Sequence, residues 1–279
     1  MPIIALLLAL APAPLGAAEV APPPQELVAA APLKAIEVAR MPAEEARQGV
    51  VADARFVYAV SNSEIGKYDR RTGRRIAHWQ GDPALFIHMN SCILLRRQIV
   101  CAASNYPGTP MASSVEWFDA GRLEHVRTRS LGPGRGSLTW LDWHDGSWWA
   151  GFAHYDGKGG EAGRDHRATT LVRYSADFSE QAAWLFPEPV LARFAPYSSS
   201  GGAWGDDGLL YVTGHDRPEL YALRLPPAGS RLELVRTIDI VTNGQAIAWQ
   251  RDARRTLWSI ERKTREAVAM TIPAVPDAR

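Results

Sequence analysis

Three histidines occur at equivalent places in consecutive stretches of this 279-residue sequence, and two carboxylates lie close to them. His88 precedes an apolar segment, His154 and His215 each follow one, and Asp216 and Glu261 come after the same kind of segment. Imidazole suits general base catalysis near neutral pH, which predicts a catalytic group of His154 or His215 beside Asp216 or Glu261. A second interpretation is a divalent transition metal held by His88, His154 and His215. Because no local spacing such as His-x-x-x-His supports the metal, a hydrogen-bonding pocket for a polar ligand is our main hypothesis.

Five repeats must position these side chains. Each repeat has an apolar strand that follows a charged or glycine-containing turn, at a spacing of about 50 residues, which is typical of a propeller blade. The residues that mark these strands are Tyr58, Cys101, Trp149, Tyr211 and Trp258. An earlier apolar segment and two later alternating segments complete four strands per repeat. The pattern predicts an all-β, five-bladed β-propeller, with an open sandwich as the competing architecture.

The two ends of the repeat array complement each other. The fifth repeat stops after a third strand at residues 266–273, whereas an extra strand-like segment at residues 33–41 precedes the first repeat. We therefore expect the N-terminal segment to supply the outer strand of the last blade and close the ring, which removes an open sheet edge. An open sandwich gives no reason for this match. The predicted propeller domain spans residues 33–273, followed by a tail at 274–279.

In a propeller the connections into each first strand and out of each second strand lie on one face. All ten of these segments are polar here, so we expect them to converge on one axial mouth. The residues that we predict to bind a ligand there are Gln48, His88, Asn90, Asn105, Tyr106, Trp140, Gln245 and Arg262. Insertions at residues 107–113 and 157–168 frame the same face, either as lids or as loops without a function.

The N-terminus and the cysteines indicate a compartment. A nine-residue apolar run at residues 3–11, followed by prolines and small residues, is typical of a signal peptide over residues 1–18, with a Pro- and Ala-rich leader at 19–32. The alternative is a buried or anchoring stretch, although a membrane span needs about 20 residues. A two-residue turn at Arg96 and Arg97 would place Cys92 opposite Cys101 as a close cross-strand pair, which allows a disulfide. The alternative is two small buried thiols. We expect a periplasmic or secreted protein.

The composition excludes some partners. With 31 Lys and Arg against 30 Asp and Glu, the net charge is +1, so no large field of one sign is present to bind nucleic acid or an anionic membrane. No other apolar run approaches the length of a membrane span. We expect a monomer that binds a small polar ligand, with no nucleic acid and no integral membrane association.

Several segments resemble those of exported bacterial propeller proteins that are often labelled cycloisomerases. The likeness covers roughly residues 33–273 and rests on segments such as 66–69, 104–107, 136–140, 152–155, 201–205, 213–216 and 244–249. The label implies a link to the muconate-lactonising propellers, which have more blades. More distantly, Gln48-Gly49 and the strand and turn at residues 58–73 resemble the five-bladed glutaminyl cyclases. That family has a catalytic Glu on the second inner strand, where this chain has His88-Met89-Asn90-Ser91.

Two classes of function follow. In the first, the axial mouth binds a small polar ligand and acts as an isomerase or lyase of the cycloisomerase kind. In the second, a non-catalytic propeller binds a sugar, a peptide or a partner protein through the same face. Turnover of a lactone or muconate-type acid, or a tightly bound divalent metal, would separate them.

Overall fold

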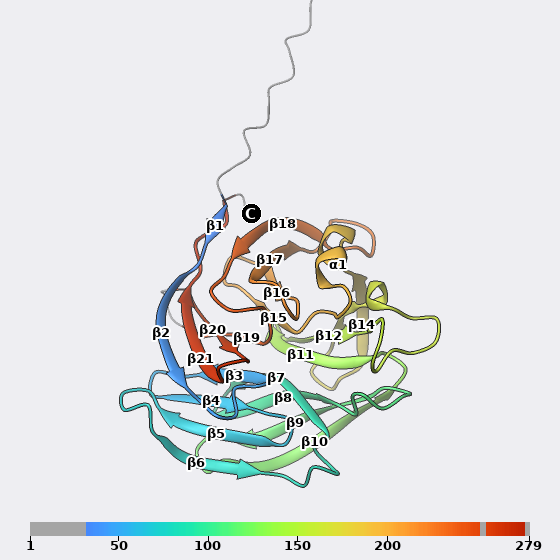
Figure 1. Ribbon diagram of the computed structural model, residues 1–279. Coiled ribbons are helices and arrows are strands. Elements are labelled where there is room, and N and C mark those ends of the chain that lie inside the picture. Colours follow the sequence, from blue (N-terminus) through green and yellow to red (C-terminus); the bar gives the residue numbers. More distant parts are fainter. Residues whose placement is uncertain (1–31, 252–254, 277–279) are drawn as a thin grey trace, which may run out of the picture. The chain divides into compact units, whose positions relative to one another are not determined.

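Five β-sheets surround a common centre (Figure 1). The computed structural model describes residues 32–251 and 255–276, and in these residues 21 strands form the five sheets. Each innermost strand contacts the innermost strand of the next blade, and the last of them contacts the first, which closes the ring. The five-bladed β-propeller is therefore confirmed, and an open sandwich is excluded.

Every blade has four strands, numbered here from the axis outwards. Blade 1 consists of β3 (Gly49–Ala52), β4 (Phe56–Val60), β5 (Glu64–Asp69) and β6 (Arg75–Gln80). Blade 2 consists of β7 (His88–Leu95), β8 (Gln98–Ser104), β9 (Ala112–Asp119) and β10 (Glu124–Pro133). Blade 3 consists of β11 (Ser137–His144), β12 (Ser147–Ala153), β13 (Thr170–Tyr174) and β14 (Glu180–Leu185).

The last two blades share the N-terminal segment. Blade 4 consists of β15 (Gly201–Trp204), β16 (Leu210–Thr213), β17 (Glu219–Arg224) and β18 (Glu233–Asp239), with β1 (Leu33–Lys34) added at its outer edge. Blade 5 consists of β19 (Ile247–Trp249), β20 (Thr256–Glu261), β21 (Glu266–Thr271) and the N-terminal β2 (Ile36–Pro42). Two short helices, η1 (His166–Ala168) and α1 (Glu188–Phe194), lie in the connections.

Ring closure by the N-terminal segment is confirmed and extends further than expected. β2 pairs antiparallel with β21 and completes blade 5, as the surplus segment predicted. The predicted single strand is in fact two, because β1 pairs in parallel with β18 of blade 4. The backbone N–H of Ala35, between the two strands, donates to the carbonyl of Asp239 at 2.8 Å. One short segment therefore joins two neighbouring blades.

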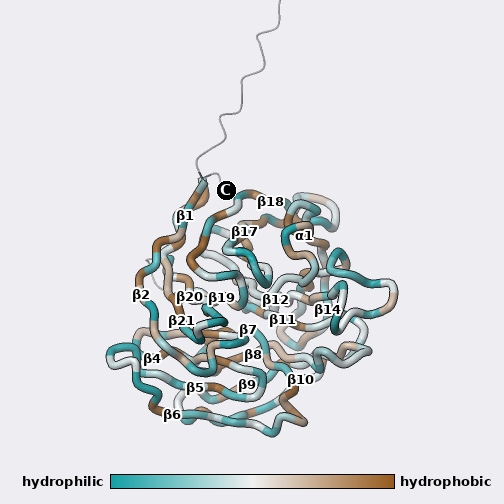
Figure 2. Tube along the Cα trace, in the orientation of Figure 1, coloured by the Kyte–Doolittle hydropathy of each residue, from teal (hydrophilic) through white to brown (hydrophobic). Residues whose placement is uncertain are grey.

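The hydrophobic core lies between the blades. It divides into five clusters, and each contains residues from two adjacent blades, such as Tyr58 and Phe118, or Val57 and Trp258. The second and third strands are buried on both faces, whereas the outer strand β6 is largely exposed. Figure 2 shows hydrophilic colours on the loops that project from the periphery. Because no cluster belongs to one blade alone, the ring is expected to fold as a unit.

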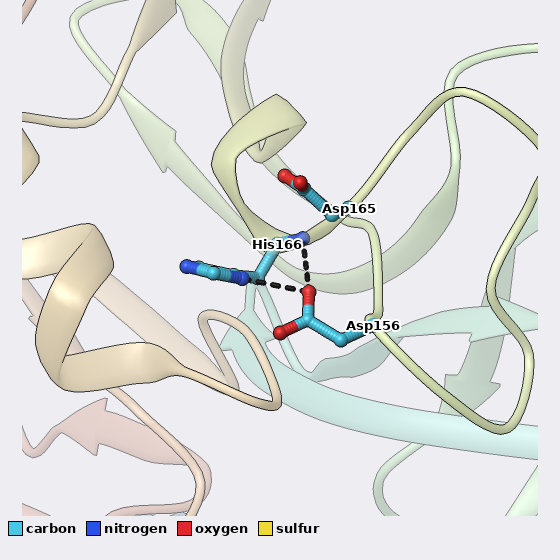
Figure 3. A group of neighbouring side chains, drawn as sticks. All are labelled: Asp156, Asp165 and His166. Atoms are coloured by element: carbon cyan, nitrogen blue, oxygen red, sulfur yellow. Dashed lines mark hydrogen bonds and ion pairs between the residues drawn. The ribbon is translucent and has the colours of Figure 1, made fainter.

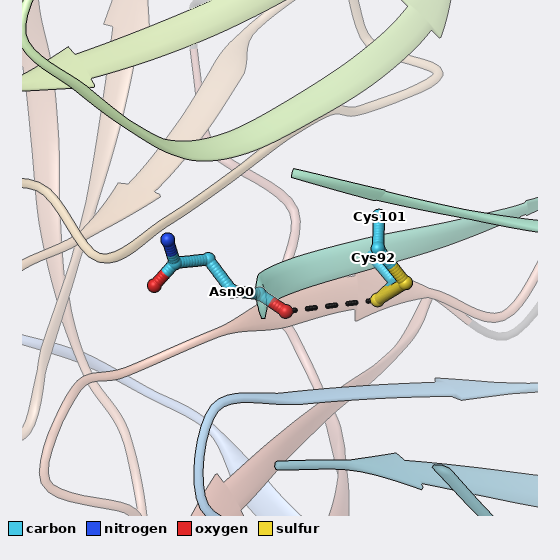
Figure 4. The surroundings of a disulfide bond; sticks show 3 residues. All are labelled: Asn90, Cys92 and Cys101. Atoms are coloured by element: carbon cyan, nitrogen blue, oxygen red, sulfur yellow. Dashed lines mark hydrogen bonds between the residues drawn. A yellow bond between two sulfur atoms is a disulfide. The ribbon is translucent and has the colours of Figure 1, made fainter. Parts of the chain in front are cut away.

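The predicted cysteine pairing is present. Cys92 and Cys101 are directly paired across β7 and β8 and form a disulfide, with their Cα atoms 4.0 Å apart (Figure 4). Arg96 and Arg97 have φ values of 48° and 66°, so the two-residue turn has the positive dihedral angles of the type I′ hairpin turn. The sulfur of Cys92 lies 3.6 Å from the carbonyl oxygen of Asn90, which is part of a bulge in β7.

Parts of the sequence interpretation fall outside the described residues. These are the predicted signal peptide at 1–18, the leader up to residue 31 and residues 277–279 of the predicted tail. Within the described part of the chain, no helix has both the length and the apolar character that crossing a bilayer requires.

Candidate functional site

A polar pocket of about 210 Å³ opens at the face where the first strand of every blade begins, and we call it the axial pocket. One polar residue from near the start of each first strand lines it. These residues are Gln48, Asn90, Thr139, Ser200 and Gln245. The remaining lining residues are His88, Tyr106, Tyr155, Tyr197, His215 and Arg262. The structure thus brings together seven of the residues that the sequence nominated, from all five blades.

Glycines allow the first strands to approach one another so closely. A Cβ atom at Gly49 would lie 2.7 Å from the carbonyl oxygen of Asn90 in the next blade. A Cβ atom at Gly201 would lie 2.5 Å from the carbonyl oxygen of Gln245. Both distances are shorter than any ordinary van der Waals contact, so only glycine permits this packing at the mouth.

The two predicted carboxylates lie beside the axial pocket and do not line it. Asp216 and Glu261 border an adjoining recess of about 340 Å³, the side recess, which shares His215 and Arg262 with the axial pocket. Asp216 still reaches the site, because its Oδ1 lies 2.6 Å from Nδ1 of His215. Glu261 instead accepts a hydrogen bond from Asn243 at 3.1 Å.

Two residues that we expected to bind a ligand do not line the axial pocket. Trp140 is fully buried, and its indole N–H donates to Oγ of Ser199 at 2.9 Å. Asn105 fastens its own loop, because its amide donates to the carbonyl of Pro110 and accepts from the N–H of Ala112. The expected ligand contact by Trp140 does not fit its complete burial.

His154 is also buried away from the axial pocket. Its side chain is 3% exposed, and Nδ1 lies 3.6 Å from Oε2 of Glu161, too far for a hydrogen bond. Burial lowers the pKa of this imidazole, with the nearby Glu161 opposing the effect. Of the two predicted bases, His215 is therefore the one that faces the axial pocket.

Four lining residues were missed by sequence reasoning. Thr139 and Tyr155 are the immediate neighbours of the nominated Trp140 and His154. A bulge in β11 between Leu138 and Trp140 shifts the alternation, so that Thr139 faces the mouth. Tyr197 and Ser200 follow α1, which the repeat pattern did not predict. Apolar residues at 190, 191 and 194 are the only local signal of that helix.

The described lining of the axial pocket contains no carboxylate, and its one permanent cation is Arg262. Burial, with a smaller effect of Arg262, lowers the pKa of His88 to about 4, so this imidazole is neutral at pH 7. Burial raises the pKa of Tyr155 to about 12 and also raises that of Tyr106, so both keep their hydroxyl protons. The pocket therefore combines weak positive charge with several hydrogen-bonding groups, which favours an anionic polar ligand.

His215 is held in one tautomer by its neighbours. Arg262 is always protonated, so its Nη1 donates to Nε2 of His215 at 3.0 Å. The proton on the ring is then on Nδ1 and is donated to Asp216 at 2.6 Å. The ring also stacks on Tyr197, with centroids 4.2 Å apart. If a ligand anion takes Arg262, the lone pair on Nε2 becomes free to accept a proton.

The three histidines proposed as metal ligands do not gather. Among the described residues, the one group of His, Cys, Asp and Glu close enough to share an ion is Asp156, Asp165 and His166. Figure 3 shows that this group is held by local contacts, since Asp156 accepts from both the backbone N–H and Nδ1 of His166. Asp165 is bound to Arg167. Nothing in this group points to a metal.

The two insertions contact each other at the edge of the mouth. Oε1 of Glu161 accepts a hydrogen bond from the backbone N–H of Met111 at 2.8 Å, which ties residues 157–168 to residues 107–113. The backbone at Gly159 approaches the ring of Tyr106, which in turn packs against His88 and Tyr155. The loops therefore support the aromatic side of the axial pocket.

The charge state of His88 predicts a pH dependence of stability. Its pKa is about 4 in the folded protein and 6.5 for a free imidazole, so the unfolded chain binds more protons between these values. The free energy of unfolding should therefore fall as the pH drops from 6.5 to 4, by at most about 3 kcal/mol from this residue. Urea unfolding at several pH values should show a shallower slope for His88→Gln. Equal slopes would mean that His88 does not titrate in this window.

Comparisons with known proteins support the fold alone. No family model matches the chain, and no curated protein does. Hydrazine synthase from Kuenenia stuttgartiensis is similar over 79% of this chain and 69% of its own, with 11% identity and a TM-score of 0.46. The Cps50 (Swd1) β-propeller domain of Myceliophteria thermophila matches over 81% of this chain and 82% of its own, with 13% identity and a TM-score of 0.42. A chain of the mitotic checkpoint complex matches over 95% of this chain and 100% of its own, with 11% identity and a TM-score of 0.43. None of these supports the cycloisomerase or glutaminyl cyclase resemblance.

Proposed function

We propose that the axial pocket binds a small hydroxylated carboxylic acid or its lactone. The observation that carries this proposal is that all five blades direct polar side chains into one pocket whose permanent charge is Arg262. A guanidinium binds a carboxylate through charge-assisted hydrogen bonds. The volume of about 210 Å³ limits the ligand to a small molecule.

The amide side chains favour hydroxyl groups on the ligand. The amide nitrogen of Gln48 donates to Asn62, that of Asn90 to the carbonyl of Leu138, and that of Gln245 to the carbonyl of His215. The amide oxygens of these three side chains then remain as acceptors for ligand hydroxyls. The tyrosine hydroxyls and Arg262 supply donors for the carboxylate or a lactone carbonyl.

The chemistry that this site supports is proton transfer, as an isomerase or lyase would use. When the ligand carboxylate takes Arg262, Nε2 of His215 accepts a proton from the carbon beside the carboxyl group. The C–H bond breaks, an N–H bond forms, and the electron pair spreads onto the carboxyl oxygens beside Arg262. Return of the proton to the other face of the carbon gives the epimer, so no oxidant or co-reactant is needed. Asp216 holds the ring and stabilises its protonated form.

Calorimetric titration with gluconate, glucuronate, gluconolactone and glucose tests the proposal. We expect the acids to bind and glucose to bind far more weakly. Replacing Arg262 by Gln should weaken acid binding by about 10- to 100-fold, since a hydrogen bond to a charged group is lost. Arg265→Gln is the control, because Arg265 is exposed on the same turn and lies in a different surface recess. Equal affinity in the Arg262→Gln variant would refute the ligand class.

Catalysis needs a separate readout. Exchange of the hydrogen beside the carboxyl group in heavy water, followed by NMR, should occur with the wild type and be lost in His215→Asn. Binding without any exchange would favour the alternative, a non-catalytic propeller that binds its ligand or a partner through the same face.

We also propose that the protein is exported to the periplasm or secreted. The disulfide between Cys92 and Cys101 fits an oxidising compartment.

A further inference from the structure

A second recess opens at the other end of the inner strands, and we call it the distal recess. It has a volume of about 210 Å³, and all five blades line it with residues near the ends of their first strands. Its walls are mostly apolar, unlike those of the axial pocket, and include Val51, Ile93, Leu95, Ala248 and Trp249. A recess of this size and character can hold the apolar part of a small ligand.

One wall of the distal recess carries a buried carboxylate. The side chain of Asp142 is 2% exposed, and its oxygens accept the backbone N–H groups of Trp143 and Trp204 at 2.9 and 2.8 Å. Burial raises the pKa of this carboxyl group, and Arg251 opposes the effect. A buried acid of this kind is stable only when it is paired.

The partner of Asp142 is loosely placed. A single nitrogen of Arg251, Nη2, lies 3.4 Å from both carboxylate oxygens, which is not the paired, short geometry of a bidentate contact. The Arg251 side chain is 48% exposed and its Nη1 donates to the carbonyl of Trp204 at 3.1 Å. The guanidinium therefore has room to bind a second anion while it stays beside Asp142.

An unpaired donor lies in the same wall. The indole nitrogen of Trp249 is buried and has no hydrogen-bond partner among the described residues, and the side chain lines the distal recess. Buried polar groups without partners are rare in folded proteins, so an acceptor supplied by a ligand would remove this cost.

We propose that the distal recess binds the zwitterion of an amino acid with an apolar side chain. The carboxylate of Asp142 pairs with the ligand ammonium, and Arg251 pairs with the ligand carboxylate. A ligand with one charge would leave either Asp142 or Arg251 without a partner, whereas a zwitterion pairs both. The apolar side chain of the ligand packs against Ile93, Leu95 and Trp249.

Titration calorimetry with leucine and phenylalanine tests this proposal, with 4-methylpentanoate and isopentylamine as ligands that carry one charge each. We expect the amino acids to bind at least about tenfold more tightly than either analogue, because each analogue loses one charge-assisted pair. Arg251→Gln should weaken leucine binding by about tenfold or more. Ala248→Leu, which fills the distal recess, should abolish binding.

Arg224→Gln is a matched control. Like Arg251, Arg224 is nearly half exposed and lies 3.4 Å from a carboxylate, but this pair is at the outer edge of blade 4. Leucine affinity should be unchanged in this variant and in Arg262→Gln. Three results would overturn the proposal: no amino acid binds the folded protein, an analogue with one charge binds as well as leucine, or Arg262→Gln abolishes leucine binding in place of Arg251→Gln.

Discussion

Deletion of residues 33–42 is expected to abolish cooperative folding. This change removes β2, so β21 loses its outer partner and the buried Val268 and Met270 become part of an open edge. β2 is mostly exposed, so it stabilises the blade through backbone pairing more than through its own side chains. Because every core cluster spans two blades, the loss should spread around the ring and approach the whole stability of a domain, about 5–15 kcal/mol.

The matched control is deletion of residues 33–35. It removes only the two-residue pairing of β1 with β18 and leaves β2 in place. Thermal and urea unfolding should show a small loss for this control and no cooperative transition for the longer deletion. If the longer deletion melts within a few degrees of the full chain, the N-terminal strand does not hold the ring closed.

Replacing Trp140 by Ala is expected to lower the free energy of unfolding by about 3–5 kcal/mol. The indole is fully buried and fills the space between two glycines, where a Cβ at Gly151 or Gly202 would lie 2.2 or 2.4 Å from it. The variant also leaves the hydroxyl of Ser199 without its indole donor. Trp140→Phe keeps much of the ring and should lose less stability.

Urea unfolding and ligand titration together decide the role of Trp140. We expect the folded fraction of Trp140→Phe to bind the acid ligand with wild-type affinity. If Trp140→Ala keeps its stability but loses binding, the residue contacts ligand, as its sequence position first indicated.

The blade number, the closure and the cysteine pairing could be predicted because each depends on local patterns. Turn residues and alternating strands recur at a regular spacing, and a strand missing at one end is matched by a spare strand at the other. The pairing of Cys92 with Cys101 follows from a turn of two residues between them. The polar character of the mouth also follows from the sequence, because loops between strands on one face can be identified without a structure.

The direction of each side chain at the mouth was decided by tertiary structure. A one-residue bulge in β11 turns Thr139 toward the axial pocket and Trp140 into the core, although the two are neighbours in sequence. Tyr197 lines the axial pocket because α1 packs onto blades 3 and 4, a contact that has no signal in the repeat pattern.

The distal recess was likewise invisible in the sequence. Asp142 and Arg251 are 109 positions apart, and they meet only because the ring places the ends of all five inner strands around one axis. Strand periods and turns act over a few residues, so the sequence by itself determined the blades and their order. Bulges, helix packing and ring closure act between blades, and they alone decided which side chains share a pocket.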